Sequence, residues 1–238
     1  MGHRGAAGAA PENTLASIRR ASEEGAPWVE FDVMLTADGV PVLHHDDSLL
    51  RTTGRDRPMA ETPFEALAGL DAGSWFSEAF AGEPLPSLEQ ALVLVAELGL
   101  HPNIEIKSTP GRDVETAVRA AEVTLRIWPA ARPAPFFCSF SAMSLAALRA
   151  LQPDWPLAFN ALSGEVAWLD SLRALDATSF HLLEREVTPE IVRQVHGAGY
   201  QLAAYTVNDG PSARRLVGLG VDAIISDRPA EILAALAA

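Results

Sequence analysis

Two short apolar segments each carry a pair of charged residues two positions apart. Glu30 and Asp32 lie in WVEFDVML, and Glu105 and Lys107 lie in NIEIK. Residues two apart in a β-strand point to the same face, so each pair is expected on one side of its strand. Burying an uncompensated carboxylate is costly, and a hard divalent cation removes that cost. These residues therefore raise the hypothesis of a metal site.

Glu30, Asp32 and Glu105 together form an all-oxygen ligand set, which suits Mg²⁺ or Ca²⁺. The competing interpretation is a structural network in which the carboxylates pair with Arg or Lys. One such pair alone favours that structural interpretation. Two such strands, with His and Arg residues beside them, favour a divalent-metal site instead.

Two of the six histidines, His3 and His45, fall at predicted strand ends beside these charged groups. Imidazole titrates near about pH 6.5, so one ring can act as a base while the other acts as an acid. A reaction in which a hydroxyl attacks and an alkoxide leaves needs both. Arg4 and Lys107 can hold phosphate oxygens and stabilise the transition state. His181 is a weaker candidate, because a histidine inside a strand is more simply part of the core.

The elements that must position these residues alternate between strand and helix. Strands are predicted at 28–35, 40–44, 103–107, 136–140, 157–160, 179–182, 200–207 and 223–226. Helices are predicted at 87–98 (with Ser87 and Gln90 as a capping box), 114–127, 142–151, from Thr188-Pro189, at 211–219 and from Pro229. This alternation over 238 residues favours a TIM (β/α)8 barrel, which takes roughly 250 residues. Active sites of such barrels form at the carboxyl ends of the strands.

Two segments depart from this alternation. Residues 51–86 show no clear period, and we interpret them as a small insertion after the second strand that covers one barrel end and buries its aromatic residues; the alternative is an ordinary surface loop. Only two residues precede His3, so the first strand is either very short or begins upstream of the printed sequence. Residues 1–238 are otherwise expected to form a single barrel domain.

Composition limits the partners. The chain has 18 Lys and Arg against 31 Asp and Glu, a net charge of −13, which disfavours nucleic acid and stable membrane association. An anionic small-molecule substrate would need positive charge supplied locally, by a metal or by placed Arg and Lys. The single cysteine, Cys138, and the lack of a leader-like or long apolar segment lead us to expect a cytoplasmic protein.

Short motifs run in a characteristic order along nearly the whole chain. They are H-R-G at His3, P-E-N-T at Pro11, E-F-D at Glu30, H-D at His45, R-T-T at Arg51, G-S-W-F at Gly73, G-E-P-L-P at Gly82, N-I-E-I-K at Asn103, S-F at Ser139, T-V-N at Thr206, G-V-D at Gly220 and S-D at Ser226. Each motif alone is weak, but this many in order is a strong signal. The chain resembles the glycerophosphodiester phosphodiesterase family, and most closely its compact cytoplasmic bacterial type.

The resemblance implies a TIM barrel with an insertion, a divalent ion that is usually Mg²⁺ or Ca²⁺, and release of glycerol 3-phosphate through a cyclic phosphate. It implies a role for each matched position: Glu30, Asp32 and Glu105 as metal ligands, His3 and His45 as general base and acid in an order left open, Arg4 and Lys107 on the phosphate, and Glu12 and Asn13 as partners of that cluster. One departure is Tyr205, where many members carry Trp.

Three other functions compete with this interpretation. The same barrel and metal set serve phospholipases that act on lysophospholipid or sphingomyelin-type lipids, although the acidic charge and the lack of an amphipathic membrane helix disfavour them. A binding module without catalysis is the second, but the full set of His, Arg, Glu and Lys residues argues against it. The third is an unrelated metal-dependent barrel such as a sugar isomerase, which explains the carboxylates but not Arg4 beside His3. The head group of the substrate and the oligomeric state are not readable from the sequence.

Overall fold

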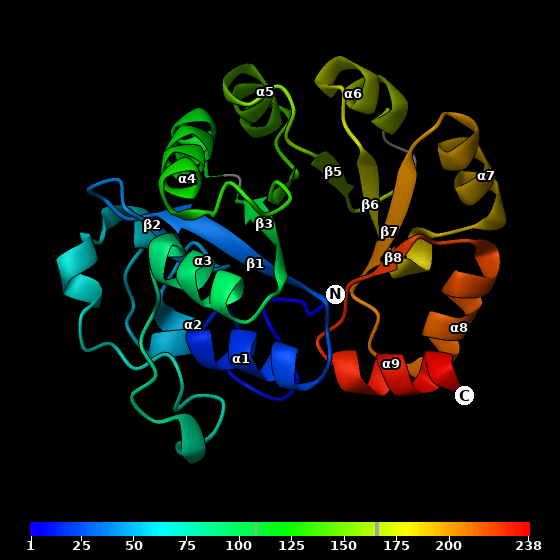
Figure 1. Cartoon of the computed structure of the whole chain (residues 1–238). Coiled ribbons are helices and arrows are strands. Elements are labelled where there is room, and N and C mark those ends of the chain that lie inside the picture. Colours follow the sequence, from blue (N-terminus) through cyan, green and yellow to red (C-terminus); the bar gives the residue numbers. More distant parts are fainter. Residues whose placement is uncertain (108, 165–166) are drawn as a thin grey trace.

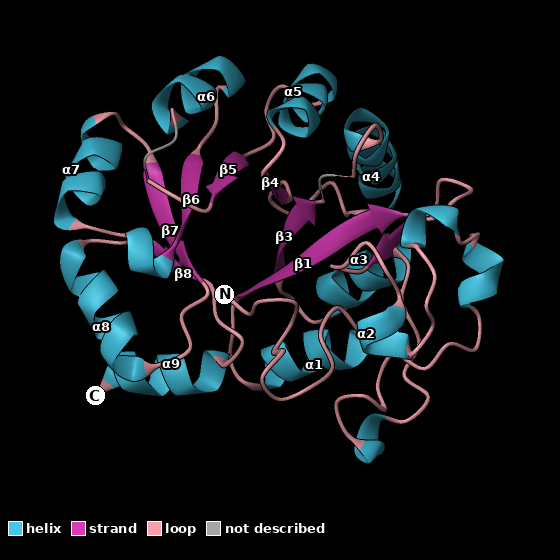
Figure 2. Ribbon diagram, turned by 180° about the vertical axis from the view of Figure 1, so that it is seen from behind, coloured by secondary structure: helices cyan, strands magenta, loops and turns pink. Residues whose placement is uncertain are grey.

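The computed structural model describes residues 1–107, 109–164 and 167–238 (Figure 1). Its strands form one curled sheet in the order β2-β1-β3-β4-β5-β6-β7-β8, and helices lie around the outside (Figure 2). All neighbours from β1 to β8 are parallel. The strands are β1 (Trp28–Leu35), β2 (Pro41–Leu43), β3 (His101–Ile106), β4 (Phe136–Ser139), β5 (Leu157–Ala161), β6 (Ser179–Leu183), β7 (Gln201–Tyr205) and β8 (Ala223–Ile224).

Gly2 closes this sheet into a barrel. It forms parallel bridges to Val29 on one side and to Ser226 on the other, and so occupies the place of the expected first strand. A Cβ atom at this position would lie 2.3 Å from the carbonyl oxygen of Gly5, which leaves room only for glycine. The predicted TIM-type barrel is thereby confirmed.

The helices follow the predicted alternation closely. They are α1 (Leu15–Glu23), α2 (Leu50–Thr53), α3 (Leu88–Glu97), α4 (Asp113–Ile127), α5 (Ala142–Leu151), α6 (Trp168–Leu175), α7 (Pro189–Gly197), α8 (Gly210–Leu219) and α9 (Pro229–Ala237). The capping box of Ser87 and Gln90 is present at the start of α3, and Thr188 caps α7. The prediction missed α1 and α6, two amphipathic helices of nine and eight residues.

The direction of β2 differs from the expected parallel alternation of strands. The predicted short strand exists, but β2 pairs antiparallel with the outer edge of β1 instead of continuing the parallel alternation. The insertion at 51–86 follows it and packs on β1 and β2 through a small apolar cluster of its own: Met34, Val42, Leu49, Met59, Leu67, Ala72 and Leu85. Trp75 stays 41% exposed, so the expectation that the aromatic residues of the insertion are buried is wrong for this side chain.

Alternation along the strands separates the core from the site. Phe31 and Ile104 are fully buried in the main apolar cluster, together with Leu92 of α3 and Ala117 of α4. Their neighbours in β1 and β3 point to the opposite face, which is the barrel interior. The apolar residues that hold the helices onto the sheet therefore also fix which way Glu30, Asp32 and Glu105 point.

Candidate active site

Three carboxylates meet inside the barrel. Glu30 and Asp32 in β1 and Glu105 in β3 each offer one oxygen, and these three oxygens lie within 4.8 Å of one another. The register of the two strands explains this, because Asp32 pairs directly with Glu105. Glu30 is 3% exposed and Asp32 is 2% exposed. The prediction that these residues share one face is confirmed.

The electrostatics of the three carboxylates differ. Burial and the neighbouring Asp32 raise the pKa of Glu30 to about 8, and its Oε1 atom is buried without a hydrogen-bond partner. Burial opposes ionisation of Asp32 as well, but Lys107 and Arg4 lower its pKa below the usual range. Burial and Asp32 raise the pKa of Glu105 despite the nearby Lys107. Clustered carboxylates with an unpaired oxygen fit a hard divalent cation, which would favour their ionised forms.

Arg4 and Lys107 supply the positive charge at this cluster. The Nζ atom of Lys107 lies 2.8 Å from Glu105 Oε1 and 3.3 Å from Asp32 Oδ1. The Nε atom of Arg4 lies 3.2 Å from Asp32 Oδ2. The structural ion-pair network and the candidate metal site thus involve the same carboxylates. Arg4 adopts a positive φ of 50°, a conformation that non-glycine residues rarely adopt.

His3 lies at the edge of the carboxylate cluster. Its Nδ1 forms a 2.7 Å hydrogen bond with Asp227 Oδ1, and its Nε2 lies 3.9 Å from Glu30 Oε2. Asp227 is held in turn by Asn208, whose Nδ2 donates to Asp227 Oδ2 at 2.6 Å. Burial opposes protonation of His3, but Asp227 and Glu30 together raise its pKa. Sequence reasoning assigned no role to Asp227, although the S-D motif after β8 marks its position.

His45 follows β2 and has a carboxylate partner as well. Its Nδ1 forms a 2.7 Å hydrogen bond with Asp46 Oδ1. No direct bond of the described residues joins His45 to the three carboxylates, although its charge contributes to the lowered pKa of Asp32. The motifs H-D and R-T-T contain Asp46 and its partner Arg51 but do not indicate their contacts with the site.

The residues expected as partners of the cluster do contact it. Glu12 Oε1 accepts a 2.7 Å bond from Arg4 Nη1. Asn13 Nδ2 donates to Asp32 Oδ2 at 2.8 Å, and the backbone N–H of Asp32 donates to Asn13 Oδ1 at 3.0 Å. Asn160 was missed, and its Nδ2 donates to Glu105 Oε2 at 3.1 Å. The backbone N–H of Arg4 donates to Glu30 Oε2 at 2.8 Å, so each carboxylate of the cluster is oriented by a neighbouring side chain or by backbone.

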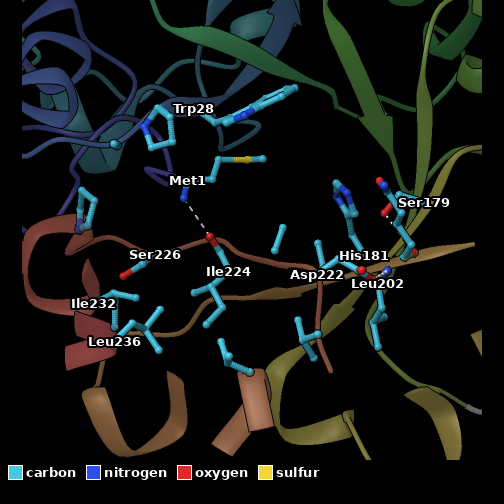
Figure 3. A pocket seen from close by; sticks show the side chains of 18 of the residues that line it. Met1, Trp28, Ser179, His181, Leu202, Asp222, Ile224, Ser226, Ile232 and Leu236 are labelled. Atoms are coloured by element: carbon cyan, nitrogen blue, oxygen red, sulfur yellow. Dashed lines mark hydrogen bonds between the residues drawn. The ribbon is translucent and has the colours of Figure 1, made fainter. Parts of the chain in front are cut away.

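Two cavities distinguish the ends of the barrel. A space of about 20 Å³ between His3, Glu30, Glu105 and Tyr205 has room for roughly one water-sized group. A larger cavity of about 420 Å³ lies at the amino ends of the strands, where Trp28 and Ser179 begin β1 and β6 (Figure 3). Among the described residues, its lining includes none of the predicted metal, phosphate or acid-base residues, and only the weaker candidate His181 borders both cavities. The small space, not the large cavity, is therefore at the chemical site.

Comparison with known proteins fits this geometry. The model of the glycerophosphoryl diester phosphodiesterase family matches residues 3–231. The chain belongs to this family. A glycerophosphodiester phosphodiesterase of Caldanaerobacter subterraneus is 32% identical to it over 98% of this chain and 95% of its own length. Membership makes the chain a phosphodiester hydrolase of this class.

Solved structures of family members share the fold. An Oleispira antarctica phosphodiesterase, solved with its product sn-glycerol 3-phosphate, is 38% identical, with a TM-score of 0.96 over 100% of this chain and 96% of that one. A Silicibacter pomeroyi protein described as a glycerophosphoryl diester phosphodiesterase is 27% identical, with a TM-score of 0.88 over 99% and 92% of the two chains. In the described part of this chain, no helix is long and apolar enough to cross a membrane.

Proposed function

We propose that this chain, acting as one domain with its insertion at 51–86, hydrolyses glycerophosphodiesters to sn-glycerol 3-phosphate and an alcohol. The observation that carries the proposal is the cluster of buried Glu30, Asp32 and Glu105 with His3 and Arg4 at its edge. The Oleispira relative, solved with sn-glycerol 3-phosphate, supports the product. The net charge of −13 favours a soluble substrate over one held in an anionic membrane, and we infer that the protein acts in the cytoplasm.

Glu30, Asp32 and Glu105 would hold the divalent ion, Mg²⁺ or Ca²⁺. The support is chemical: an all-oxygen donor set, and a buried Glu30 oxygen that has no other partner. When bound, such an ion withdraws electron density from phosphate oxygens and so makes phosphorus easier to attack. Asn13 and Asn160 orient two of the three ligands by the hydrogen bonds described above.

Arg4 and Lys107 would bind the phosphate. Both are largely buried beside the carboxylates, and together they supply the local positive charge that an acidic protein needs for an anionic substrate. Glu12 accepts a hydrogen bond from the guanidinium of Arg4 and so restricts its orientation. Charge builds up on the phosphate oxygens in the transition state, so fixed cations at this position lower the barrier.

His3 and His45 would exchange protons with the substrate. In each ring Nδ1 is bound to a carboxylate, Asp227 or Asp46, so Nε2 is the nitrogen left for the substrate. One histidine removes the proton of the attacking glycerol hydroxyl, and the other protonates the departing alkoxide. Water then opens the resulting cyclic phosphate, with the two roles exchanged.

A comparison of two choline-containing substrates tests this function against a lipid substrate. Glycerophosphocholine and lysophosphatidylcholine micelles are incubated separately with the protein and divalent metal, and choline release is measured. Faster release from glycerophosphocholine, together with equal amounts of sn-glycerol 3-phosphate, is expected. Release from the lysophospholipid alone would contradict the proposal and favour a phospholipase.

A further inference from the structure

Arg51, at the start of the insertion in α2, connects two sides of the site. One edge of its guanidinium binds Asp46, with Nε 2.6 Å from Oδ2 and Nη2 3.1 Å from Oδ1. The other edge binds Glu12, with Nη1 2.7 Å from Oε2 and Nη2 2.7 Å from Oε1. Asp46 contacts His45, and Glu12 contacts Arg4. The reaction described above assigns Arg51 no part.

We propose that Arg51 is a positioning residue for the hydrolysis: it fixes the carboxylate of Asp46, and Asp46 then orients the ring of His45. This inference rests on the proposed function of the site. Asp46 and His45 are both partly exposed and adjacent in sequence. Without a partner, a partly exposed carboxylate rotates among several positions, and the ring hydrogen-bonded to it would rotate as well.

The donors of Arg51 show why it would act through its neighbours and not on the substrate. Arginine has five N–H donors, and four hydrogen bonds to Asp46 and Glu12 engage four of them. Exposed ion pairs contribute little on average, but bidentate pairs within a network are the exception. A lysine cannot reproduce this planar double fork.

Trp75, another residue of the insertion, also contacts Arg51. The guanidinium carbon lies 5.6 Å from the ring centroid of Trp75, and the Trp75 ring is fixed by a 2.8 Å bond from its Nε1 to the carbonyl oxygen of Ala72. Such a cation–π contact favours a guanidinium that stays over the ring. The insertion would thereby be linked to the chemistry through Trp75, Arg51 and Asp46.

A double-mutant cycle between Arg51 and His45 tests the proposal. The kcat for glycerophosphocholine is measured for the wild type, Arg51→Met, His45→Ala and the double variant. If Arg51 acts through His45, Arg51→Met lowers kcat roughly 10- to 100-fold in the wild type and less than about threefold when His45 is already alanine. Equal loss in both backgrounds would overturn the proposal and assign Arg51 a direct role or one through Arg4.

Matched variants exclude trivial explanations. Arg126 also forms a 2.7 Å ion pair, with Glu89, but on the exposed surface, so Arg126→Met should leave kcat within about twofold. Arg51→Lys keeps the positive charge but cannot form the bidentate hydrogen bonds. Its kcat should therefore lie between those of Arg51→Met and the wild type. Thermal unfolding of each variant identifies any that simply fail to fold.

A measurement without turnover separates this proposal from the proposed function. In ¹⁵N NMR spectra of the imidazole side chains, His45 of the wild type should carry its proton on Nδ1, hydrogen-bonded to Asp46. Arg51→Met should replace that signal with a mixture of tautomers. The same signal in wild type and variant would overturn the positioning role. An inactive wild type with the expected spectral change would instead overturn only the proposed reaction.

Discussion

The carboxylate of Asp227 lies 2.7 Å from Nδ1 of His3, although 224 positions separate them in the chain. The barrel closure brings them together, because the backbone N–H of His3 donates to the carbonyl oxygen of Ser226 at 2.7 Å. The contact that completes the sheet therefore also builds one side of the site. If His3 acts as proposed, fold stability and catalysis are linked at this point of the molecule.

Asp227→Asn should lower kcat roughly 10- to 100-fold, because an amide can present its NH₂ group to His3 and no longer selects one tautomer and orientation of the ring. The variant keeps the size of the side chain, so the unfolding midpoint should change little. Steady-state kinetics with glycerophosphocholine measure the effect. A kcat within about twofold of the wild type would remove Asp227 from this role.

His45→Ala should lower the rate roughly 10²- to 10⁴-fold through the loss of acid-base catalysis. The side chain is partly exposed and follows β2, so the fold should be retained. Turnover and circular dichroism are measured on the same preparation. Near-normal turnover in a folded variant would show that His45 does not transfer a proton.

Gly2→Ala should destabilise the barrel by about 1–3 kcal/mol, because the added methyl group would lie 2.3 Å from the carbonyl oxygen of Gly5 and the backbone must shift. Urea unfolding measures the change. Gly218→Ala in α8 is the matched control, since nothing lies within 4 Å of its added Cβ, and its stability should be equal or higher. Equal stability of both variants would contradict the account of barrel closure.

His181 should make the stability depend on pH. Burial lowers the pKa of His181 to about 3 from an unfolded value of 6.5. Between these values the unfolded chain binds a proton that the folded chain does not, so stability falls as the pH falls below 6.5. Acidification from pH 7 to 5 should cost about 2 kcal/mol through this group.

His181→Gln removes the titrating group and should make the decline of the unfolding free energy between pH 7 and 5 shallower by that amount. Urea unfolding at several pH values measures both proteins. Parallel pH profiles for the wild type and the variant would show that His181 is not buried in its neutral form.

The sequence predicts those features that depend on local pattern. The bounds of β1, the capping box at Ser87, and the shared face of Glu30 and Asp32 follow from periodicity and spacing, and all three are confirmed. The antiparallel direction of β2 does not follow, because three residues show no period that distinguishes pairing directions.

The side-chain contacts around the site could not be predicted either, and the reason is different. The pairing of His3 with Asp227 depends on barrel closure, which joins the two ends of the chain. The bonds of Arg51 to Asp46 and Glu12 depend on side-chain torsions within an insertion that has no regular period. In both cases the motifs H-R-G, S-D and R-T-T mark the residues but not their partners.

The most direct test of the account is the metal dependence of glycerol 3-phosphate release from glycerophosphocholine. Wild type and Glu105→Ala are treated with EDTA and then titrated with Mg²⁺ or Ca²⁺. The account predicts no turnover after EDTA, full recovery of the wild type, and recovery of Glu105→Ala only in part and at higher metal concentration. Turnover that persists in EDTA, or the same metal dependence in both proteins, would contradict it.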